Sequence, residues 1–220
     1  MLKKLAIFDI DYTITRKETL MELFKYTIKN DKKNLKFLPR AAYCGLMYLM
    51  KFYDEKKVKE TFLKFIDKIE EKDLALLVKN FYNDRLQNIL YKDALNMMKD
   101  LKSKGYDIYL ISASPEFYVN EFYAIKEVDK IFGTKFKFEN GAFLRQMDGE
   151  NCKGEEKVKR LKSYLDENNI EVDFKESYMF SDSLSDKPLL DMVGKPYLIN
   201  YKNGHKNIEI LKWNRHYKRK

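Results

Sequence analysis

The sequence predicts an α/β fold in which a Rossmann-like parallel sheet is flanked by helices, with a helical cap inserted after the first strand. Three observations carry this prediction. Short apolar runs without helical periodicity recur along the chain, amphipathic stretches separate most of them, and one long N-terminal region has helical periodicity alone. With 220 residues and 45 % hydrophobic content, the chain can bury a sizeable core.

Four apolar runs are predicted to be buried parallel strands, because none has helical spacing and polar residues follow them. They span residues 5–8, 106–111, 177–181 and 196–200. Helices are expected at 92–104, 115–125, 155–166 and 186–193. Residues 134–144 alternate in hydrophobicity around Asn140-Gly141, which predicts a β-hairpin.

The region after the first strand has apolar positions at helical spacing, such as Leu20, Leu23 and Phe24, and no strand pattern. We therefore expect an α/β core formed by residues 1–16 and 91–220, and a helical cap formed by residues 17–90. The basic tail at 213–220 is expected to be a solvated terminus.

Composition excludes several classes of function. The net charge of +9 favours anionic partners, but the cations are mostly lysine, so sequence-specific nucleic-acid binding is not expected. Both histidines, His205 and His216, lie near the C-terminus, which argues against histidine-based catalysis or a histidine-ligated zinc site. Two cysteines, Cys44 and Cys152, are too few for a disulfide framework, and no apolar run fits a signal peptide or a membrane span. We expect a cytoplasmic protein.

Acidic residues follow two of the predicted strands: Asp9 and Asp11 the first, Asp182 and Asp186 the third. Because the carboxyl ends of parallel strands meet at one edge of a sheet, these side chains are expected to share the crevice where open α/β sheets bind ligands. Clustered carboxylates repel one another, and a hard divalent cation relieves that repulsion. The sequence therefore predicts a Mg²⁺ site. For Asp186 an N-cap role is an alternative interpretation.

Other residues at the same edge point to anion binding. Ser112, Ala113 and Ser114 end the second strand at an expected helix N-terminus, where backbone N–H groups favour a phosphate. Ser114 also fits an ordinary N-cap before Pro115, so Ser112 is the better phosphate donor. A lysine in the first turns of the helix expected at 155–166 could neutralise a phosphate in the crevice.

Four segments, in this order, resemble the four motifs of the haloacid dehalogenase (HAD) superfamily. They are Phe-Asp-Ile-Asp-Tyr-Thr at 8–13, Ile-Ser-Ala-Ser-Pro-Glu at 111–116, Gly-Glu-Glu-Lys-Val at 154–158 and Ser-Asp-Ser-Leu-Ser-Asp at 181–186. The resemblance spans nearly the whole chain and is strongest to the phosphoserine-phosphatase-like branch, subfamily IB, whose members carry a helical cap between the first and second motifs. It implies a Mg²⁺-dependent phosphatase that hydrolyses a phosphomonoester through an aspartyl-phosphate intermediate.

By this resemblance Asp9 would be the nucleophile, and Asp11 would protonate the leaving oxygen and then activate water. Mg²⁺ would be held by Asp9, Asp182 and the backbone carbonyl of Asp11. Asp186 would act beside the metal or through a water molecule.

The resemblance also implies residues that contact the phosphate. Thr13 and Ser112 would hydrogen-bond locally and to phosphate, with Ala113 and Ser114 beside them. Lys157 would balance the charge; Lys153, one helical turn earlier, is the alternative. Lys157 is preferred because apolar residues then follow it where the family's helix is apolar.

Two residues near the first motif bear on substrate choice. Glu18 lies where phosphoserine phosphatases bind the substrate amino group, although a glutamate near a helix start is also a favourable first-turn charge. Tyr12 stands where the family often has glycine, and its bulk is expected to narrow the mouth of the site. The expected substrate is a small phosphorylated metabolite, phosphoserine-like, or a phospholipid intermediate.

Three alternatives stay open. The apolar stretch 35–53, edged by Lys36, Arg40 and Lys51, either packs within the cap or lies on an anionic membrane surface. A receiver-like phospho-signalling module uses similar residue types, but its phosphate goes to a mid-chain strand, where this chain has Ser112 and no aspartate. The third alternative is a basic nucleic-acid-binding protein with a vestigial site.

Overall fold

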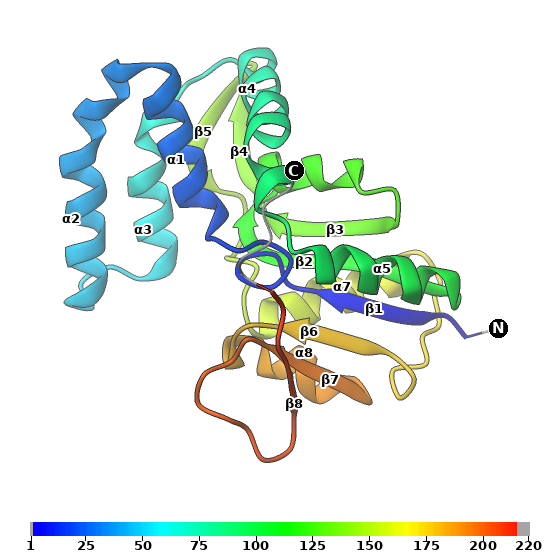
Figure 1. The fold of residues 1–220 in the computed structure, drawn as a ribbon. Helices are drawn as coiled ribbons and strands as arrows, with labels where there is room; N and C mark the ends of the chain where they lie inside the picture. Colours follow the sequence, from blue (N-terminus) through cyan, green and yellow to red (C-terminus); the bar gives the residue numbers. More distant parts are fainter. Residues whose placement is uncertain (1, 215–220) are drawn as a thin grey trace.

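A computed structural model describes residues 2–214 (Figure 1). Its centre is a six-stranded parallel sheet with strand order β3-β2-β1-β6-β7-β8, which confirms the predicted fold class. The strands are β1 Lys4–Phe8, β2 Tyr106–Pro115, β3 Val128–Thr134, β6 Tyr178–Ser181, β7 Lys195–Ile199 and β8 Glu209–Leu211. The helices that flank it are α5 Lys92–Ser103, α7 Glu155–Glu167 and α8 Lys187–Met192.

Side chains of β1 alternate between two apolar layers, one on each face of the sheet. Leu5 and Ile7 belong to the layer covered by α7 and α8, whereas Ala6 and Phe8 belong to the layer that α5 covers. The period-2 geometry of a strand and a cover of helices on both faces explain why this run is apolar throughout. Because β1 is buried on both faces, Asp9 emerges from it at a fixed place.

The region between β1 and α5 folds as helices joined by 3₁₀ turns. Its α-helices are α1 Thr19–Asn30, α2 Leu38–Leu49, α3 Glu55–Phe62 and α4 Glu71–Asp84, and its 3₁₀ turns are Lys32–Phe37, Leu63–Ile66 and Leu86–Ile89. Leu23, Phe62 and Phe81 belong to the same apolar cluster as Phe8, so these helices share one core with the sheet. In Figure 1, α2 and α3 stand beside the sheet at the left of the molecule.

A hairpin of β4 Phe136–Glu139 and β5 Ala142–Met147 turns at Asn140-Gly141, as predicted, and both turn residues have positive φ. It packs on the helical region and not on the main sheet. The Phe143 N–H donates to the Ile69 carbonyl (2.9 Å), and the Lys68 N–H donates to the Phe143 carbonyl (2.9 Å). Residues of the second half of the chain thus complete the helical region.

Several predictions about local structure were wrong. The helix expected at 115–125 is two short pieces, α6 Glu116–Val119 and a 3₁₀ turn Asn120–Ala124, and Pro115 is the last residue of β2. Trp213, expected in a solvated tail, is buried against Tyr91 with ring centroids 5.7 Å apart. The rest of that tail, residues 215–220 with His216, lies outside the described residues.

Gly133 of β3 lies against the backbone of Glu116, the residue that directly follows β2. A Cβ atom at this position would lie 2.6 Å from the Cα of Glu116, a backbone atom that cannot rotate away. By contrast, a Cβ at Gly45, within α2, would meet nothing within 4 Å.

We expect Gly133→Ala to lower the free energy of unfolding by about 1–3 kcal/mol, because the backbone after Pro115 must shift. Gly45→Ala is the control and should raise it by about 0.5–1 kcal/mol, since alanine favours a helix interior. Chemical denaturation of both variants measures the difference. Equal stability of the two variants would show that the close approach of β3 to this segment is unimportant.

Candidate active site

Three chain segments meet at the carboxyl ends of β1, β2 and β6. The Asp9 N–H donates to the Phe180 carbonyl (3.0 Å), so the hydrogen bonding between β1 and β6 continues one residue beyond the end of β1. One step further, the Asp182 N–H donates to Thr13 Oγ1 (2.9 Å). Thr13 is fully buried, so its hydroxyl joins the loops that bear the two acidic motifs.

Lys157 is the cation at the centre of this site. Its Nζ lies 2.7 Å from Asp9 Oδ1 and 2.8 Å from Asp186 Oδ2, and all three side chains are buried. Lys153 instead pairs with Glu55 of α3. The structure therefore puts Lys157, and not Lys153, beside Asp9. Asp186 precedes α8 but makes no side-chain cap to it; its Oδ2 also accepts from the Ser181 hydroxyl (2.8 Å).

Asp11 is held by the helical region and by the segment that ends β2. Its Oδ1 accepts from the Thr19 N–H (2.6 Å), and its Oδ2 accepts from the Ser114 hydroxyl (2.6 Å). Thr19 Oγ1 lies 2.9 Å from the Tyr118 hydroxyl, which extends the network into the core. The alternative interpretation of Ser114 as an N-cap was wrong, because the helix begins at Glu116 and Ser114 holds Asp11.

The site carries more negative than positive charge. Burial and the neighbouring carboxylates Asp186 and Asp11 raise the pKa of Asp9 to about 8, although Lys157 opposes this. Burial, Asp186 and Asp11 likewise raise the pKa of Asp182 to about 6. Asp186 Oδ1 is buried without a hydrogen-bond partner among the described residues. Four carboxylates around a single buried lysine thus favour binding of an additional cation.

The carboxylates do not form a complete metal cage. Within residues 2–214 no three acidic, histidine or cysteine side chains converge as a set of metal ligands. The side chain of Asp11, expected near the metal, is turned to Thr19 and Ser114, and Lys157 engages one oxygen each of Asp9 and Asp186. The carboxylate of Asp182 and the second oxygens of Asp9 and Asp186 remain, and such an open set suits Mg²⁺, which keeps several waters.

The segment that ends β2 is fixed by hydrogen bonds from two sides. The Ser114 N–H donates to Ser112 Oγ (3.0 Å), and Ser112 is buried. The Ala113 carbonyl accepts from Lys59 Nζ (2.6 Å) and from Thr134 Oγ1 (2.7 Å). Lys59 belongs to α3, so a helix of the inserted region reaches the crevice.

Lys59 and Glu18 are charged residues of the helical region that interact electrostatically with Asp11. Burial lowers the pKa of Lys59 to about 8, against the opposing charges of Glu55, Asp11 and Glu18. Glu18 is the N-cap of α1, accepting from the Leu20 and Met21 N–H groups, and burial together with Asp11 raises its pKa to about 7. The acidic residue expected to stabilise the start of this helix, Glu18, is therefore the N-cap of α1.

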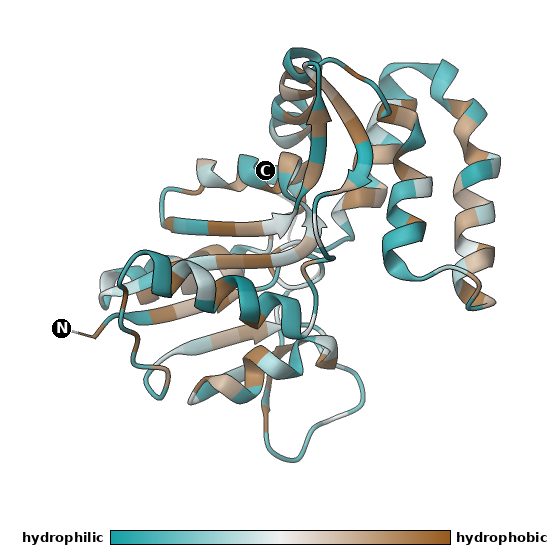
Figure 2. Ribbon diagram, turned by 180° about the vertical axis from the view of Figure 1, so that it is seen from behind, coloured by the Kyte–Doolittle hydropathy of each residue, from teal (hydrophilic) through white to brown (hydrophobic). Residues whose placement is uncertain are grey.

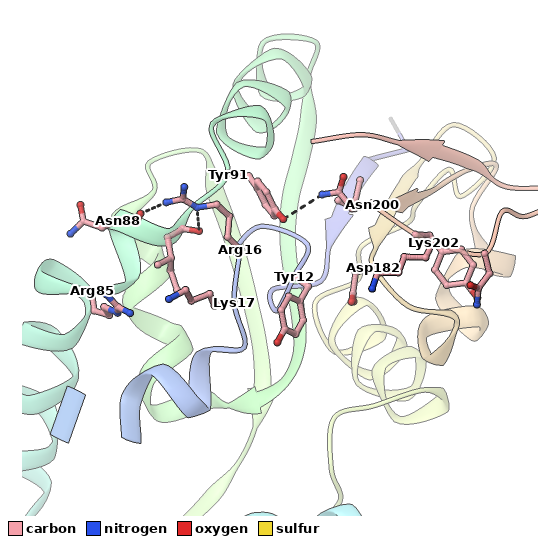
Figure 3. A pocket seen from close by; sticks show the side chains of 13 residues that line it. Tyr12, Arg16, Lys17, Arg85, Asn88, Tyr91, Asp182, Asn200 and Lys202 are labelled. Carbon is pink, nitrogen blue, oxygen red and sulfur yellow. Dashed lines mark hydrogen bonds between the residues drawn. The ribbon is translucent and has the colours of Figure 1, made fainter. Parts of the chain in front are cut away.

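A cleft of about 770 Å³ opens beside the acidic cluster (Figure 3). Tyr12 and Asp182, which belong to the two acidic motifs, are among the residues that line it. Tyr12 has φ +57°, a conformation that favours glycine, and its side chain is half exposed. The cationic residues that line the cleft are Arg16, Lys17, Arg85 and Lys202. Lys17 and Arg85 both pair with the buried Glu22 carboxylate, so part of this positive charge is already compensated.

The family of haloacid dehalogenase-like hydrolases matches residues 6–191 of this chain. The chain belongs to this family. Curated relatives of the HAD protein include a probable phosphatase of Mycobacterium tuberculosis, 22 % identical over 213 residues that cover 94 % of this chain and 73 % of the relative. Another is a phosphoserine phosphatase of Lactococcus lactis, 24 % identical over 195 residues, which cover 87 % and 81 %. The HAD protein is accordingly a phosphoric monoester hydrolase.

Solved structures share the fold. A Bordetella pertussis protein of unknown function superimposes with a TM-score of 0.85 at 19 % identity, covering 96 % of this chain and 99 % of that one. A phospho-aspartyl intermediate analogue of phosphoserine phosphatase superimposes with a TM-score of 0.65 at 17 % identity, covering 92 % and 88 %. Both proteins therefore share the arrangement of sheet and helices described above.

Four residues of the site were not found by sequence reasoning: Thr19, Lys59, Tyr118 and Asn151. Thr19 directly follows Glu18, so a search of the helix start could have included it. Lys59 lies in a lysine-rich helix, and its contacts with Ala113 and Asn151 Oδ1 (2.7 Å) form only when the helical region folds over the sheet. No local signal distinguishes it.

We expect Lys157→Met to lower the free energy of unfolding by about 3–5 kcal/mol and to abolish phosphatase activity, because it leaves the buried Asp9 and Asp186 without their shared cation. Lys153→Met is the matched control: its partner Glu55 is partly exposed, so the loss should stay below about 1 kcal/mol. Chemical denaturation and hydrolysis of p-nitrophenyl phosphate measure both effects. Similar losses in the two variants would contradict the central place of Lys157.

Proposed function

We propose that the HAD protein hydrolyses a phosphomonoester in a Mg²⁺-dependent reaction through an aspartyl-phosphate on Asp9. The observation that carries this proposal is the buried contact of Lys157 Nζ with Asp9 Oδ1 at 2.7 Å. It anchors one oxygen of the carboxylate and leaves Oδ2 as the nucleophile. Attack of Oδ2 on phosphorus forms the Asp9–phosphate bond and releases the alcohol. Water then attacks the same phosphorus, which frees Asp9 and yields inorganic phosphate.

Asp11 is the proposed acid and base. In the first step it gives its proton to the leaving oxygen, and in the second it takes a proton from the attacking water. The Thr19 N–H and the Ser114 hydroxyl hold the Asp11 side chain in one rotamer. Asp11 is therefore already oriented for proton transfer. Ser112 and Ala113 belong to the same fixed segment and are proposed to border the phosphate.

Mg²⁺ is proposed to bind Asp9, Asp182 and the Asp11 carbonyl. The unbalanced charge of the cluster and the unpartnered Asp186 Oδ1 support a cation there. When bound, Mg²⁺ would neutralise the charge that develops on the transferred phosphoryl group. Thr13, which accepts a hydrogen bond from the Asp182 N–H, is proposed to keep the Asp182 loop at the right distance from Asp9.

The proposed substrate is a small phosphorylated metabolite or a phospholipid intermediate. Lys202 in the cleft and the net positive charge of the chain favour a substrate with anionic character beyond the reacting phosphate. Glu18 is a candidate partner for a substrate amino group, because a cation would relieve the burial and the repulsion by Asp11 that disfavour its carboxylate, and the similarity to a phosphoserine phosphatase supports testing phosphoserine first. A screen of phosphorylated amino acids, sugars, nucleotides, choline phosphate and phospholipids identifies the class. A receiver-like module would instead accumulate a stable acyl-phosphate without turnover.

Asp9→Asn is expected to lower the rate of p-nitrophenyl phosphate hydrolysis at least about a thousandfold, because an amide cannot attack phosphorus. EDTA should abolish the wild-type rate, and added Mg²⁺ should restore it. Steady-state assays of wild type with Mg²⁺, wild type with EDTA and the variant test this. Equal rates in all three would refute the mechanism.

The ionisation of Lys59 is expected to make KM depend on pH. It has three N–H donors, of which two are used by Ala113 and Asn151, so one is available for an anionic substrate. Because its pKa is about 8, it loses its proton as pH rises through 8, and KM for the screened substrate should rise about tenfold by pH 9.

In Lys59→Arg the guanidinium stays charged, so this rise in KM should disappear while kcat keeps its pH profile. In Lys59→Met, KM should be high throughout. KM measured from pH 6.5 to about 9.5 for the three proteins separates these outcomes. A rise of the same size in Lys59→Arg would exclude Lys59 as its origin.

A further inference from the structure

One face of α2 is apolar and exposed to solvent. Leu38, Ala42, Leu46 and Leu49 follow the spacing of a single helix face. Leu49 is 80 % exposed, more than any other large hydrophobic side chain that is exposed in the described part of the chain. We define the α2 outer face by these residues and the exposed neighbours that extend it: Leu35, Leu38, Ala42, Leu46, Leu49, Met50 and Phe52.

The opposite side of α2 already packs on the protein. Cys44 is buried there, and Phe37 and Ala41 pack against the main core. The helix stands at the edge of the molecule, and the hydropathy colours of Figure 2 show apolar residues along most of its length. A helix that is apolar on both sides is typical of one covered on both sides. A contiguous exposed patch of this kind marks an interaction surface.

The chain segment that carries this face has charges of one sign. Between Asp31 and Asp54 the chain contains no acidic residue. The cations in this interval are all exposed: Lys32, Lys33, Lys36, Arg40 and Lys51. They lie before α2, in its first turn and just after it, so positive charge borders the apolar face at both ends. Apolar residues flanked by cations alone are complementary to an anionic lipid surface.

We propose that the α2 outer face binds the surface of an anionic membrane, with its leucines in the boundary between headgroups and acyl chains and its cations on lipid phosphates. The contact is peripheral, since the described residues include no helix long and apolar enough to cross a bilayer. The proposal rests on this face alone and holds whatever ester the active site hydrolyses.

The test is co-sedimentation of the full chain with vesicles of equal parts phosphatidylglycerol and phosphatidylcholine, and with vesicles of phosphatidylcholine alone. The protein should bind the anionic vesicles, and salt should weaken the binding. Leu46→Ser with Leu49→Ser should lower the affinity about a hundredfold, since each buried leucine is worth about a tenfold factor or more. Lys36→Gln, Arg40→Gln and Lys51→Gln together should lower it about a hundredfold, because each cation near an anionic surface is worth about a fivefold factor.

Leu76→Ser is the matched control, since Leu76 is 60 % exposed but lies on α4, and its affinity should equal that of wild type. Thermal melting and p-nitrophenyl phosphate hydrolysis show that each variant is folded; if the leucine variant is not, the cation variant decides. Failure of the wild type to sediment, or equal affinity of the α2 variants and the control, overturns the proposal. So does a wild-type dimer that the leucine variant dissociates without any vesicle binding, because a second copy then covers the face.

Discussion

A single buried ammonium group organises this site. Lys157 contacts Asp9 and Asp186 at once, and all three side chains are almost withdrawn from water. Buried carboxylates without a cation are costly, so the position of each acid depends on that of the lysine. The lysine comes from α7, Asp9 from the end of β1 and Asp186 from the turn before α8, and the folded sheet is what brings these segments together. Stability and the proposed chemistry therefore depend on the same contact.

The parallel sheet brings the segments of the site next to one another. β1 lies between β2 and β6, so the residues that follow these three strands are neighbours although they are far apart in the sequence. The helical region adds what the sheet cannot supply: the Thr19 N–H holds Asp11, and Lys59 reaches the Ala113 carbonyl. A movement of the helices relative to the sheet would change both contacts. The orientation of Asp11 and the position of the Ala113 carbonyl therefore both depend on how the helical region packs on the sheet.

Sequence reasoning predicted the fold class and the segments of the site because both depend on local patterns: apolar runs that end in acidic or hydroxyl residues. Prediction from the sequence failed where contacts between distant segments determine the structure. β3 and β8 were not predicted, because β3 mixes charged residues with apolar ones and β8 has three residues, too few for a period. Pro115 extends β2 because pairing with Thr134 outweighs its preference for a helix start. Lys59 could not be distinguished from other lysines of its helix.

The proposed covalent intermediate gives the most direct test of this account. A crystal structure of the protein soaked with Mg²⁺ and beryllium fluoride, which mimics a phosphoryl group on a carboxylate, should show the beryllium bonded to Asp9 Oδ2. Lys157 should keep its contact with Oδ1, and the metal should lie between Asp9 and Asp182. Beryllium fluoride on another residue, or Asp182 turned away from the metal, would contradict the account.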